Sequence, residues 1–463
     1  MKRCFIWAGR KTLVHQEAGV SPAIFIVRRY MSAKVFGFIK REDPYDPEDI
    51  FAVASVKCQE LICEAVSQYE NEDYTPLDEP VRYNILWLAF THVTYDVLDF
   101  RMNDLDREYL KAVTRNFKNS VEDIANYSLD ITIDLHFIED TTPLSKLESS
   151  GNLYLARETI KHLIEKCSSD KDIDTVLTTI QTKGNDNRDR NILKGAYRDN
   201  KAALGLAFTN ITGDMPYSTF DLTLPEDGTY PLEDTSVPSL YATAVAVHEW
   251  MHQFECLGKM LSIEYPPTHA YQGSSLYPGY REYISNENDY DYFEFYKLVL
   301  TGKLPYEADG NIKHVGMYPK MWPLIKRNVF NIGCFTIRGS GGEGYLTGKT
   351  SEPKLSLSDE PCVWKISCSV NGGLILSPKD IPDMRIDLNN AWDSEGNTIG
   401  LQYPTNYPQA QTWSIKKEKD GLYLIETVFE SKRVLTATAD NVILCSDHKK
   451  SYQRWIIEPC KDS

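Results

Sequence analysis

Residues 240–257, LYATAVAVHEWMHQFECL, decide how this chain is interpreted. Small and apolar side chains fill the stretch, which predicts a buried helix over these positions. Because a helical turn takes about 3.6 residues, His248 and His252 project from one face and can aim imidazole nitrogens at one Zn²⁺. Glu249 lies one step around the helix, where it can reach a metal-bound water and accept its proton.

The third zinc ligand must come from downstream, because a catalytic zinc site uses three protein ligands and leaves a fourth position for water. After the helix, His269 and His314 precede the C-terminal region. We expect His269, which lies in the rigid turn Pro266-Pro267-Thr268-His269 that can return the chain beneath the helix. Glu282, and after it Glu264, stay open as alternatives.

Two other residues close to the pair of histidines have expected structural roles. Glu255 follows His252 by three residues, so we expect it to orient a ligand or meet solvent rather than bind metal. Gly258 is a suitable C′ residue and is expected to end the helix.

The segments that precede the helix extend this pattern. Ala203–Thr209 and Tyr217–Leu224 are expected to be short strands, and a strand beside the helix could hold an extended peptide by edge pairing. With a sheet, an edge strand and the His-Glu-x-x-His helix, residues from about 130 to about 300 resemble the zincin metallopeptidases. The resemblance implies a zinc metalloendopeptidase. Zincins with a third His six residues after the second are excluded, because Gly258 stands there.

The same resemblance implies a Tyr or His that stabilises the oxyanion. A tyrosine-rich stretch after the helix supplies Tyr283, Tyr290 and Tyr292. We assign Tyr290 as the catalytic tyrosine beside Glu249 and expect most of the others to pack.

A threefold repeat marks the C-terminal region. Trp364, Trp413 and Trp455 are separated by 49 and 42 residues. Gln411 and Gln453 stand two residues before the second and third Trp, and Cys362 takes that place in the first. Residues from about 328 to 463 therefore resemble ricin B-like lectin domains, which implies a β-trefoil.

The resemblance also implies carbohydrate binding, for which the middle repeat comes closest to a binding site. It offers an acidic group, an aromatic face and amide side chains in Asp387, Tyr403, Asn406 and Gln411. The aromatic residue falls one position late, and Ala410 stands where relatives carry an Asn. A trefoil that serves as a spacer or docks a protein is the alternative.

The block before the zinc helix is expected to hold further helices and a strand. Apolar residues at helical spacing predict a helix over 105–126 with Asp104 as its N-cap. Strict alternation predicts a strand over 129–137, and a second helix is expected over Leu155–Cys167.

Length and charge bound the remaining possibilities. A chain of 463 residues suggests two or three domains, and a net charge of −16 disfavours nucleic acid and anionic membrane partners. No apolar run reaches the 18 residues of a membrane span. Residues 1–30 are basic and lack a clear secretory signal, so the localisation stays open between secreted and soluble inside the cell. Met1 and Met31 both stay open as the start.

These observations predict a multidomain protein. A basic extension, 1–31, outside the fold would precede an α+β zincin-like domain, 32–327, and an all-β β-trefoil, 328–463. The expected activity is zinc-dependent hydrolysis of a protein or glycoprotein substrate. The alternatives are a catalytically inactive zincin-fold module that binds glycans or proteins, and a zinc hydrolase that acts on another bond.

Overall fold

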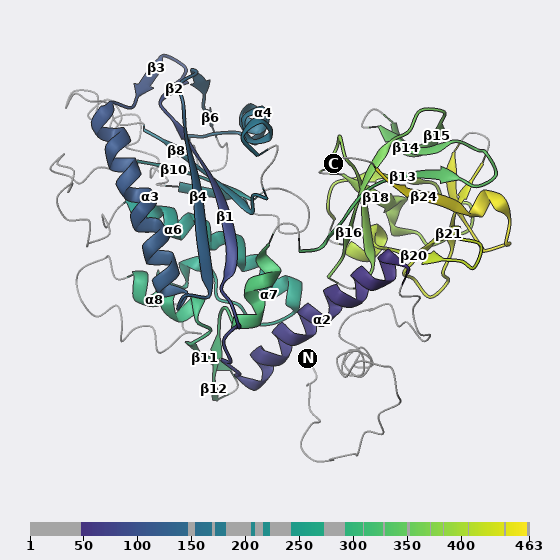
Figure 1. The fold of residues 1–463 in the computed structure, drawn as a ribbon, viewed down its shortest axis with the longest axis horizontal. Coiled ribbons are helices and arrows are strands. Elements are labelled where there is room, and N and C mark those ends of the chain that lie inside the picture. The colour runs from purple at the N-terminus through teal and green to yellow at the C-terminus, as the bar shows by residue number, and fades with distance from the viewer. Residues whose placement is uncertain are drawn as a thin grey trace.

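The chain divides into an α/β half and an all-β half, which lie side by side in Figure 1. The computed structural model describes residues 48–146, 153–168, 172–181, 205–208, 216–222, 242–272, 292–308, 310–326, 329–349, 352–370, 372–382, 384–405, 407–438 and 441–460. The expected N-terminal extension and the expected domain boundary at 327 and 328 lie outside these residues.

The first half supplies most of the described helices. They are α2 (Ile50–Asn71), α3 (Asp104–Ile124), α4 (Arg157–Ser168), α6 (Ala242–Met251), α7 (Glu255–Leu261) and α8 (Tyr292–Leu300), with the 3-10 turns η1 (His252–Phe254), η2 (Thr268–Gln272) and η4 (Pro319–Ile325). The strands are β1 (Val81–Phe90), β2 (His92–Tyr95), β3 (Leu98–Arg101), β4 (Leu129–Ile138), β5 (Thr142–Pro143), β6 (Ser145–Lys146), β7 (Leu153–Tyr154), β8 (Thr175–Ile180), β9 (Gly205–Phe208), β10 (Tyr217–Asp221), β11 (Leu304–Ala308) and β12 (Asn311–Val315).

A five-stranded sheet with the order β4-β1-β8-β10-β9 organises this half. The first four strands are parallel, and β9 pairs antiparallel with β10 at one edge. Parallel neighbours need a crossover, which α3 provides between β1 and β4. This half therefore alternates strands and helices in an α/β arrangement, and the α+β class expected from the sequence is wrong in that respect.

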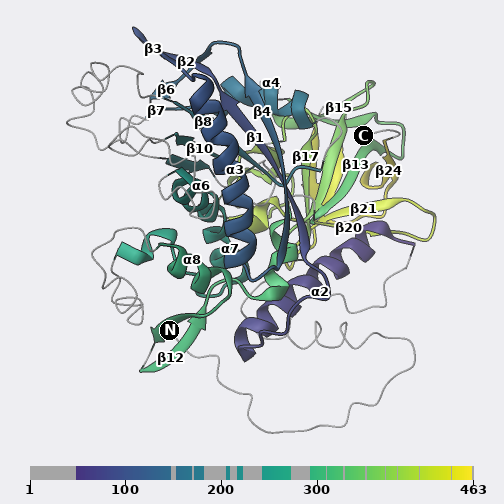
Figure 2. The same cartoon turned by 60° about the vertical axis from the view of Figure 1, so that its left-hand side comes forward.

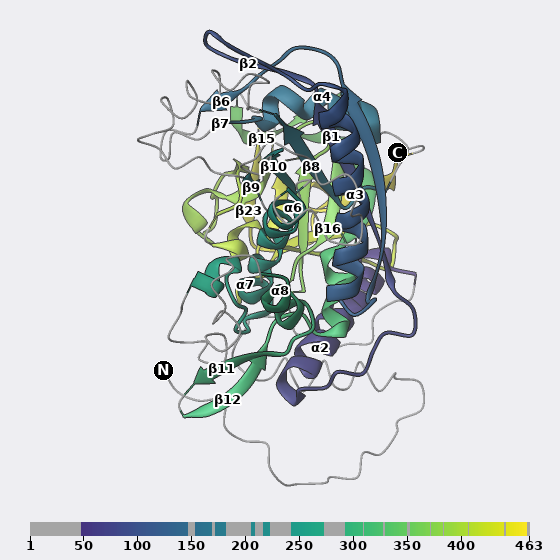
Figure 3. The ribbon, with the colours of Figure 1, turned by 90° about the vertical axis from the view of Figure 1, so that its left-hand side faces the viewer.

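Apolar clusters cover both faces of the sheet, as parallel sheets require. Helices α3 and α6 lie side by side over one face (Figure 3). There Trp87 of β1, Phe117 of α3 and Trp250 of α6 belong to one buried cluster. On the other face, Leu88 and Val176 pack with Ile160 of α4. The predicted strand over 129–137 is confirmed as β4, and the predicted helix over 155–167 is confirmed as α4.

Helix α3 confirms the amphipathic helix predicted before β4, but its cap differs. Asn103, not Asp104, is the N-cap, and it forms a capping box with Asp106. The Asn103 side chain accepts the Asp106 N–H while the Asp106 carboxylate accepts the Asn103 N–H, so two otherwise unsatisfied donors are satisfied together.

The predicted helix over 240–257 is formed by α6, η1 and α7 in succession, with a tighter 3-10 turn at His252. Gly258 does not end it, because α7 continues to Leu261 and stops at Ser262, whose φ is +51°. A Cβ at Gly258 would lie 2.8 Å from the Cβ of Tyr265. Glycine is required there because the returning chain passes close to the helix.

In the described part of the second half, twelve strands form three sets of four. They are β13 (Asn331–Gly339), β14 (Tyr345–Lys349), β15 (Glu352–Ser358), β16 (Val363–Cys368), β17 (Leu374–Pro378), β18 (Arg385–Leu388), β19 (Ile399–Gln402), β20 (Trp413–Lys417), β21 (Tyr423–Thr427), β22 (Val434–Ala437), β23 (Val442–Cys445) and β24 (Trp455–Pro459), with the 3-10 turns η5 (Asn389–Ala391), η6 (Pro408–Gln411) and η7 (Ser451–Gln453).

Six of these strands close a ring. In each set the first and fourth strands pair with neighbours in the order β13-β16-β17-β20-β21-β24, and β24 returns to β13. The middle two strands of each set form the hairpins β14-β15, β18-β19 and β22-β23. A six-stranded barrel with three hairpins is a β-trefoil.

The three repeated Trp residues hold equivalent positions in this trefoil. Trp364, Trp413 and Trp455 are fully buried, and each Nε1 donates to a backbone carbonyl in the second strand of its own set. The acceptors are the carbonyl oxygens of Leu346, Ile386 and Leu435, at 2.9, 3.2 and 3.1 Å respectively. The threefold repeat predicted from the sequence is therefore confirmed.

Helix α2 joins the two halves. In Figure 2 it lies beneath the trefoil strands β20 and β21. At its N-terminal end the buried Phe51 ring lies 5.2 Å from the Phe335 ring and 5.5 Å from the Tyr423 ring. Farther along, Gln59 Nε2 donates to the Gly372 carbonyl at 3.3 Å. These contacts fix the first half of α2 to the barrel.

The second half of α2 contacts the α/β half. The Tyr69 hydroxyl accepts the Glu264 N–H at 3.2 Å, and Gln68 Oε1 accepts the Lys320 N–H at 2.7 Å. One helix thus contacts the trefoil at one end and the segment leading to His269 at the other. Among the described helices, none is long and apolar enough to cross a membrane.

Candidate metal centre

Three histidines from three elements converge at one point. His248 comes from α6, His252 from η1 and His269 from η2, and their ligand atoms all lie within 4.8 Å of one another. The Nε2 atoms of His248 and His252 are 3.2 Å apart. The His269 ring centroid lies 4.7 Å from that of His248 and 4.9 Å from that of His252. Three imidazoles gathered in this way fit a zinc ion.

The alternative third ligands are placed less favourably or lie outside the described residues. Glu264 is exposed and is not part of the histidine group. Glu282 lies outside the described residues, as does Tyr290. Within the part of the chain that the structure describes, His269 is the residue brought to the pair.

The outer ring nitrogens of the two helix histidines are hydrogen-bonded away from the centre. His248 Nδ1 lies 2.7 Å from the buried Tyr296 hydroxyl of α8, and His252 Nδ1 lies 2.9 Å from Glu255 Oε1. Such partners fix the orientation of each ring, and the two Nε2 atoms face each other. The predicted orienting role of Glu255 agrees with this contact.

Tyr296 was not identified from the sequence. It lies one helical turn after Tyr292, the first residue of α8 and the last tyrosine considered there. The contact joins residues 48 positions apart, so local spacing does not reveal it. The only sequence signal was a tyrosine within an apolar helix.

Burial and neighbouring charges favour neutral imidazoles at two positions. Burial, followed by the charges of His252 and His269, lowers the pKa of His248 to about 3. Burial also lowers the pKa of His269. At His252 burial acts in the same direction, but the hydrogen bond to Glu255 and the charges of Glu249 and Glu255 outweigh it and raise the pKa. Neutral imidazole is the form that binds metal.

Glu249 is nearly inaccessible to solvent, with 6% of its surface exposed. Burial raises its pKa to about 7, although the charge of His252 opposes the shift. A carboxyl with this pKa can accept and return a proton near neutral pH. The Glu249 carbonyl accepts the Ser218 hydroxyl of β10 at 3.1 Å, which ties the helix to the sheet beside its edge strand β9.

The trefoil residues selected from the sequence have contrasting environments. Asp387 is buried, and burial raises its pKa to about 6 against the opposing hydrogen bond with Gln411. Gln411 Nε2 donates to the Tyr403 carbonyl at 2.8 Å and its Oε1 accepts the Thr405 N–H at 3.2 Å. Gln411 therefore holds the loop that presents Tyr403, which is 62% exposed. Asn406 lies outside the described residues.

Asp387 distinguishes the middle repeat from the other two. It follows Ile386, whose carbonyl accepts the Trp413 indole, and the equivalent residues are Thr347 and Thr436. Two aromatic residues that were not selected from the sequence, Trp392 and Tyr407, are 65% and 67% exposed in the same repeat. The middle repeat thus combines the carboxyl with exposed aromatic rings.

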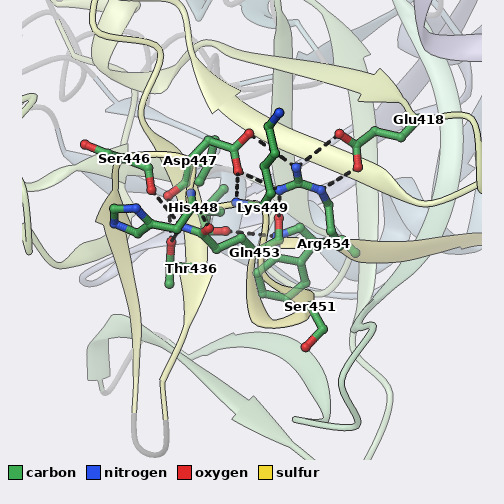
Figure 4. A network of polar contacts seen from close by, with 12 residues as sticks. Glu418, Thr436, Ser446, Asp447, His448, Lys449, Ser451, Gln453 and Arg454 are labelled. Atoms are coloured by element: carbon green, nitrogen blue, oxygen red, sulfur yellow. Dashed lines mark hydrogen bonds and ion pairs between the residues drawn. The ribbon is translucent and has the colours of Figure 1, made fainter.

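The third repeat repeats the Gln arrangement and adds an ion-pair network (Figure 4). Gln453 Nε2 donates to the Ser446 carbonyl at 2.8 Å and its Oε1 accepts the His448 N–H at 2.7 Å. Arg454, which is buried, donates to the carboxylates of Asp447 and Glu418. This loop is fixed by charge-assisted hydrogen bonds, which are stronger than neutral ones.

Comparison with known proteins gives matches to solved structures. No protein-family model and no curated protein matches the chain. A mosquitocidal holotoxin is similar at a TM-score of 0.25 and 15% identity, over 28% of this chain and 17% of its own. ThreeFoil, a designed 3-fold symmetric protein, is similar at 0.24 and 17% identity, over 28% and 99% of the two chains. SeviL, solved bound to asialo-GM1 saccharide, is similar at a TM-score of 0.23 and 12% identity, over 28% of this chain and 98% of its own. The trefoil assignment itself follows from the strand pairing.

Proposed function

We propose that this protein is a zinc-dependent metalloendopeptidase of the zincin type. His248, His252 and His269 would hold the zinc ion. The observation that carries the proposal is the paired orientation of the helix histidines, whose Nε2 atoms face each other at 3.2 Å while both Nδ1 atoms have hydrogen-bond partners. Metal-binding histidines generally have this arrangement, with the second nitrogen held by an outer partner.

Bound zinc would supply a Lewis acid that lowers the pKa of a water toward about 7 and polarises a carbonyl. Glu249 would accept the proton of that water and later return it to the leaving amine. Its burial supports this role, because burial raises the pKa of the carboxyl to about 7. Near neutral pH such a carboxyl can be either protonated or ionised, and the reaction requires both forms. Tyr290 remains the predicted oxyanion residue and lies outside the described residues.

The edge of the sheet favours a peptide as the substrate. Among the strands that the structure describes, β9 is the last of the five-stranded sheet, and both α6 and η1 pack against it. An extended peptide that pairs with this edge would run beside the three histidines, with main-chain hydrogen bonds holding it in register.

The test compares wild type with Glu249→Gln for bound zinc and for cleavage of a denatured protein. We expect both proteins to bind one zinc per chain and the variant to lose on the order of 10² to 10⁴ in rate, because the proton acceptor is removed. Substantial turnover by the variant would contradict the role of Glu249. Zinc binding without turnover in wild type would favour the inactive binding module or hydrolysis of another bond.

A second function, carbohydrate binding by the middle repeat, is supported by the coincidence of Asp387 with exposed aromatic rings. Sugar sites combine an acid for the hydroxyl groups with an aromatic face for the ring. We expect Tyr403→Ala to abolish retention on immobilised glycans. Tyr452→Ala, which removes a 38% exposed tyrosine from the third repeat, is the matched control. Equal retention by both variants would exclude this site.

A further inference from the structure

We propose that Glu255 is a positioning residue that fixes the third zinc ligand, His269, relative to the helix that carries the other two. The inference rests on the proposed function and concerns how the same site is assembled. Glu255 Oε1 accepts from His252 Nδ1 at 2.9 Å and from the Thr268 N–H at 2.7 Å. One carboxylate oxygen thus contacts one ligand directly and the residue adjacent to another.

The position of His269 depends on its segment, because this residue is exposed whereas the helix histidines are half-buried. The preceding stretch, residues 262–267, forms neither helix nor strand. In the middle of this stretch, Tyr265 packs against Gly258 and the Glu264 N–H donates to the Tyr69 hydroxyl. Glu255 provides the anchor at the other end, immediately before His269.

The charge of the Glu255 carboxylate strengthens this anchor. Its Oε1 atom accepts from both His252 Nδ1 and the Thr268 N–H. A charged acceptor makes each of these hydrogen bonds stronger than a neutral one. The carboxylate therefore presets the third ligand before metal binds, which lowers the ordering cost of binding.

Tyr296 provides the internal comparison. It bonds to His248 Nδ1, as Glu255 bonds to His252 Nδ1, but it comes from α8 rather than from the histidine segment. Tyr296→Phe removes one orienting contact and leaves the Thr268 anchor intact. Glu255→Ala removes the orienting contact and the anchor together.

The experiment measures zinc affinity by chelator competition on the full chain. Loss of an outer partner costs about 10- to 100-fold in metal affinity. We expect Tyr296→Phe to weaken zinc binding about 10-fold and Glu255→Ala to weaken it about 100-fold or more. Glu255→Gln, whose amide oxygen can still accept the Thr268 N–H, should lie between them. Glu264→Ala, which removes an exposed carboxylate from the same segment, should bind zinc as wild type does.

A spectroscopic readout separates positioning from general stability. Cobalt-substituted wild type and Tyr296→Phe should share a visible spectrum, whereas Glu255→Ala should resemble His269→Ala because both lose the third ligand. Glu255→Ala could also lower the melting temperature of the metal-free protein. In that case the zinc affinity and the cobalt spectrum of Glu255→Gln test the positioning role instead.

Wild-type affinity and spectrum in both Glu255 variants, together with loss of zinc in His269→Ala, would overturn the positioning role and leave the proposed function intact. Absence of zinc binding by wild type would overturn both.

Discussion

The Nε2 atom of His248 lies 3.2 Å from the Nε2 atom of His252, although the two residues come from different helical elements. The two nitrogens lie within hydrogen-bonding distance, and the tautomer of each ring decides which one donates. A zinc ion bound by both Nε2 atoms would replace this contact, because a metal ligand must offer a deprotonated nitrogen. The geometry is the basis of the predictions that concern zinc.

Zinc should stabilise the folded protein. A ligand that binds the native state at about 1,000 times its Kd adds about 4 kcal/mol to the free energy of unfolding. Thermal unfolding with and without a chelator should therefore show a lower melting temperature for the stripped protein, restored by adding zinc. An identical melting temperature in both samples would contradict a folded-state zinc site.

Asp387 should make the trefoil less stable as pH rises. Its pKa is raised to about 6 in the folded protein by burial, so the folded state holds a proton that the unfolded chain releases near pH 4. Stability contributed by the protonated form is present below about pH 4 and is lost as pH rises toward 6. We expect Asp387→Asn to be more stable than wild type at pH 7, by about 3 kcal/mol.

The measurement is the difference in unfolding free energy between Asp387→Asn and wild type, from denaturant titrations at pH 4 and pH 7. The difference should be larger at pH 7, where the wild-type carboxyl is ionised and buried. A variant that is less stable than wild type at pH 7 would show that the charged form of Asp387 is favoured in the fold.

Phe51 should couple the unfolding of the two halves. Its ring is fully buried against Phe335 and Tyr423, and truncation of a buried Phe costs about 3 to 5 kcal/mol. Phe51→Ala should split thermal unfolding into two transitions, because α2 then loses its aromatic contacts with the barrel. Val53→Ala, which changes a 39% exposed residue of the same helix, is the control. A single unchanged transition in Phe51→Ala would refute the coupling.

The parts of the site that depend on local spacing could be predicted from the sequence. Helical periodicity alone places His248 and His252 on one face, and Glu255 within reach of His252. The separation of the three Trp residues likewise identified the repeat, because each copy buries an equivalent indole. His269 followed from the rigid Pro-Pro turn before it.

Other features depend on contacts between distant segments. Tyr296 meets His248 through the packing of α8, which no spacing encodes. Helix α2 was not predicted because its buried residues divide between two partners and produce no strong single-face pattern. Gly258 was misassigned as a helix end because the close approach of Tyr265, the actual reason for a glycine there, involves a later part of the chain.

The most direct test of the account is the zinc content of purified wild type beside His269→Ala and Glu264→Ala, measured with the melting temperature of each metal-free protein. We predict one zinc per chain in wild type and Glu264→Ala, and a large loss in His269→Ala with unchanged metal-free stability. Stoichiometric zinc retained by His269→Ala, or none in wild type, would contradict the three-histidine site.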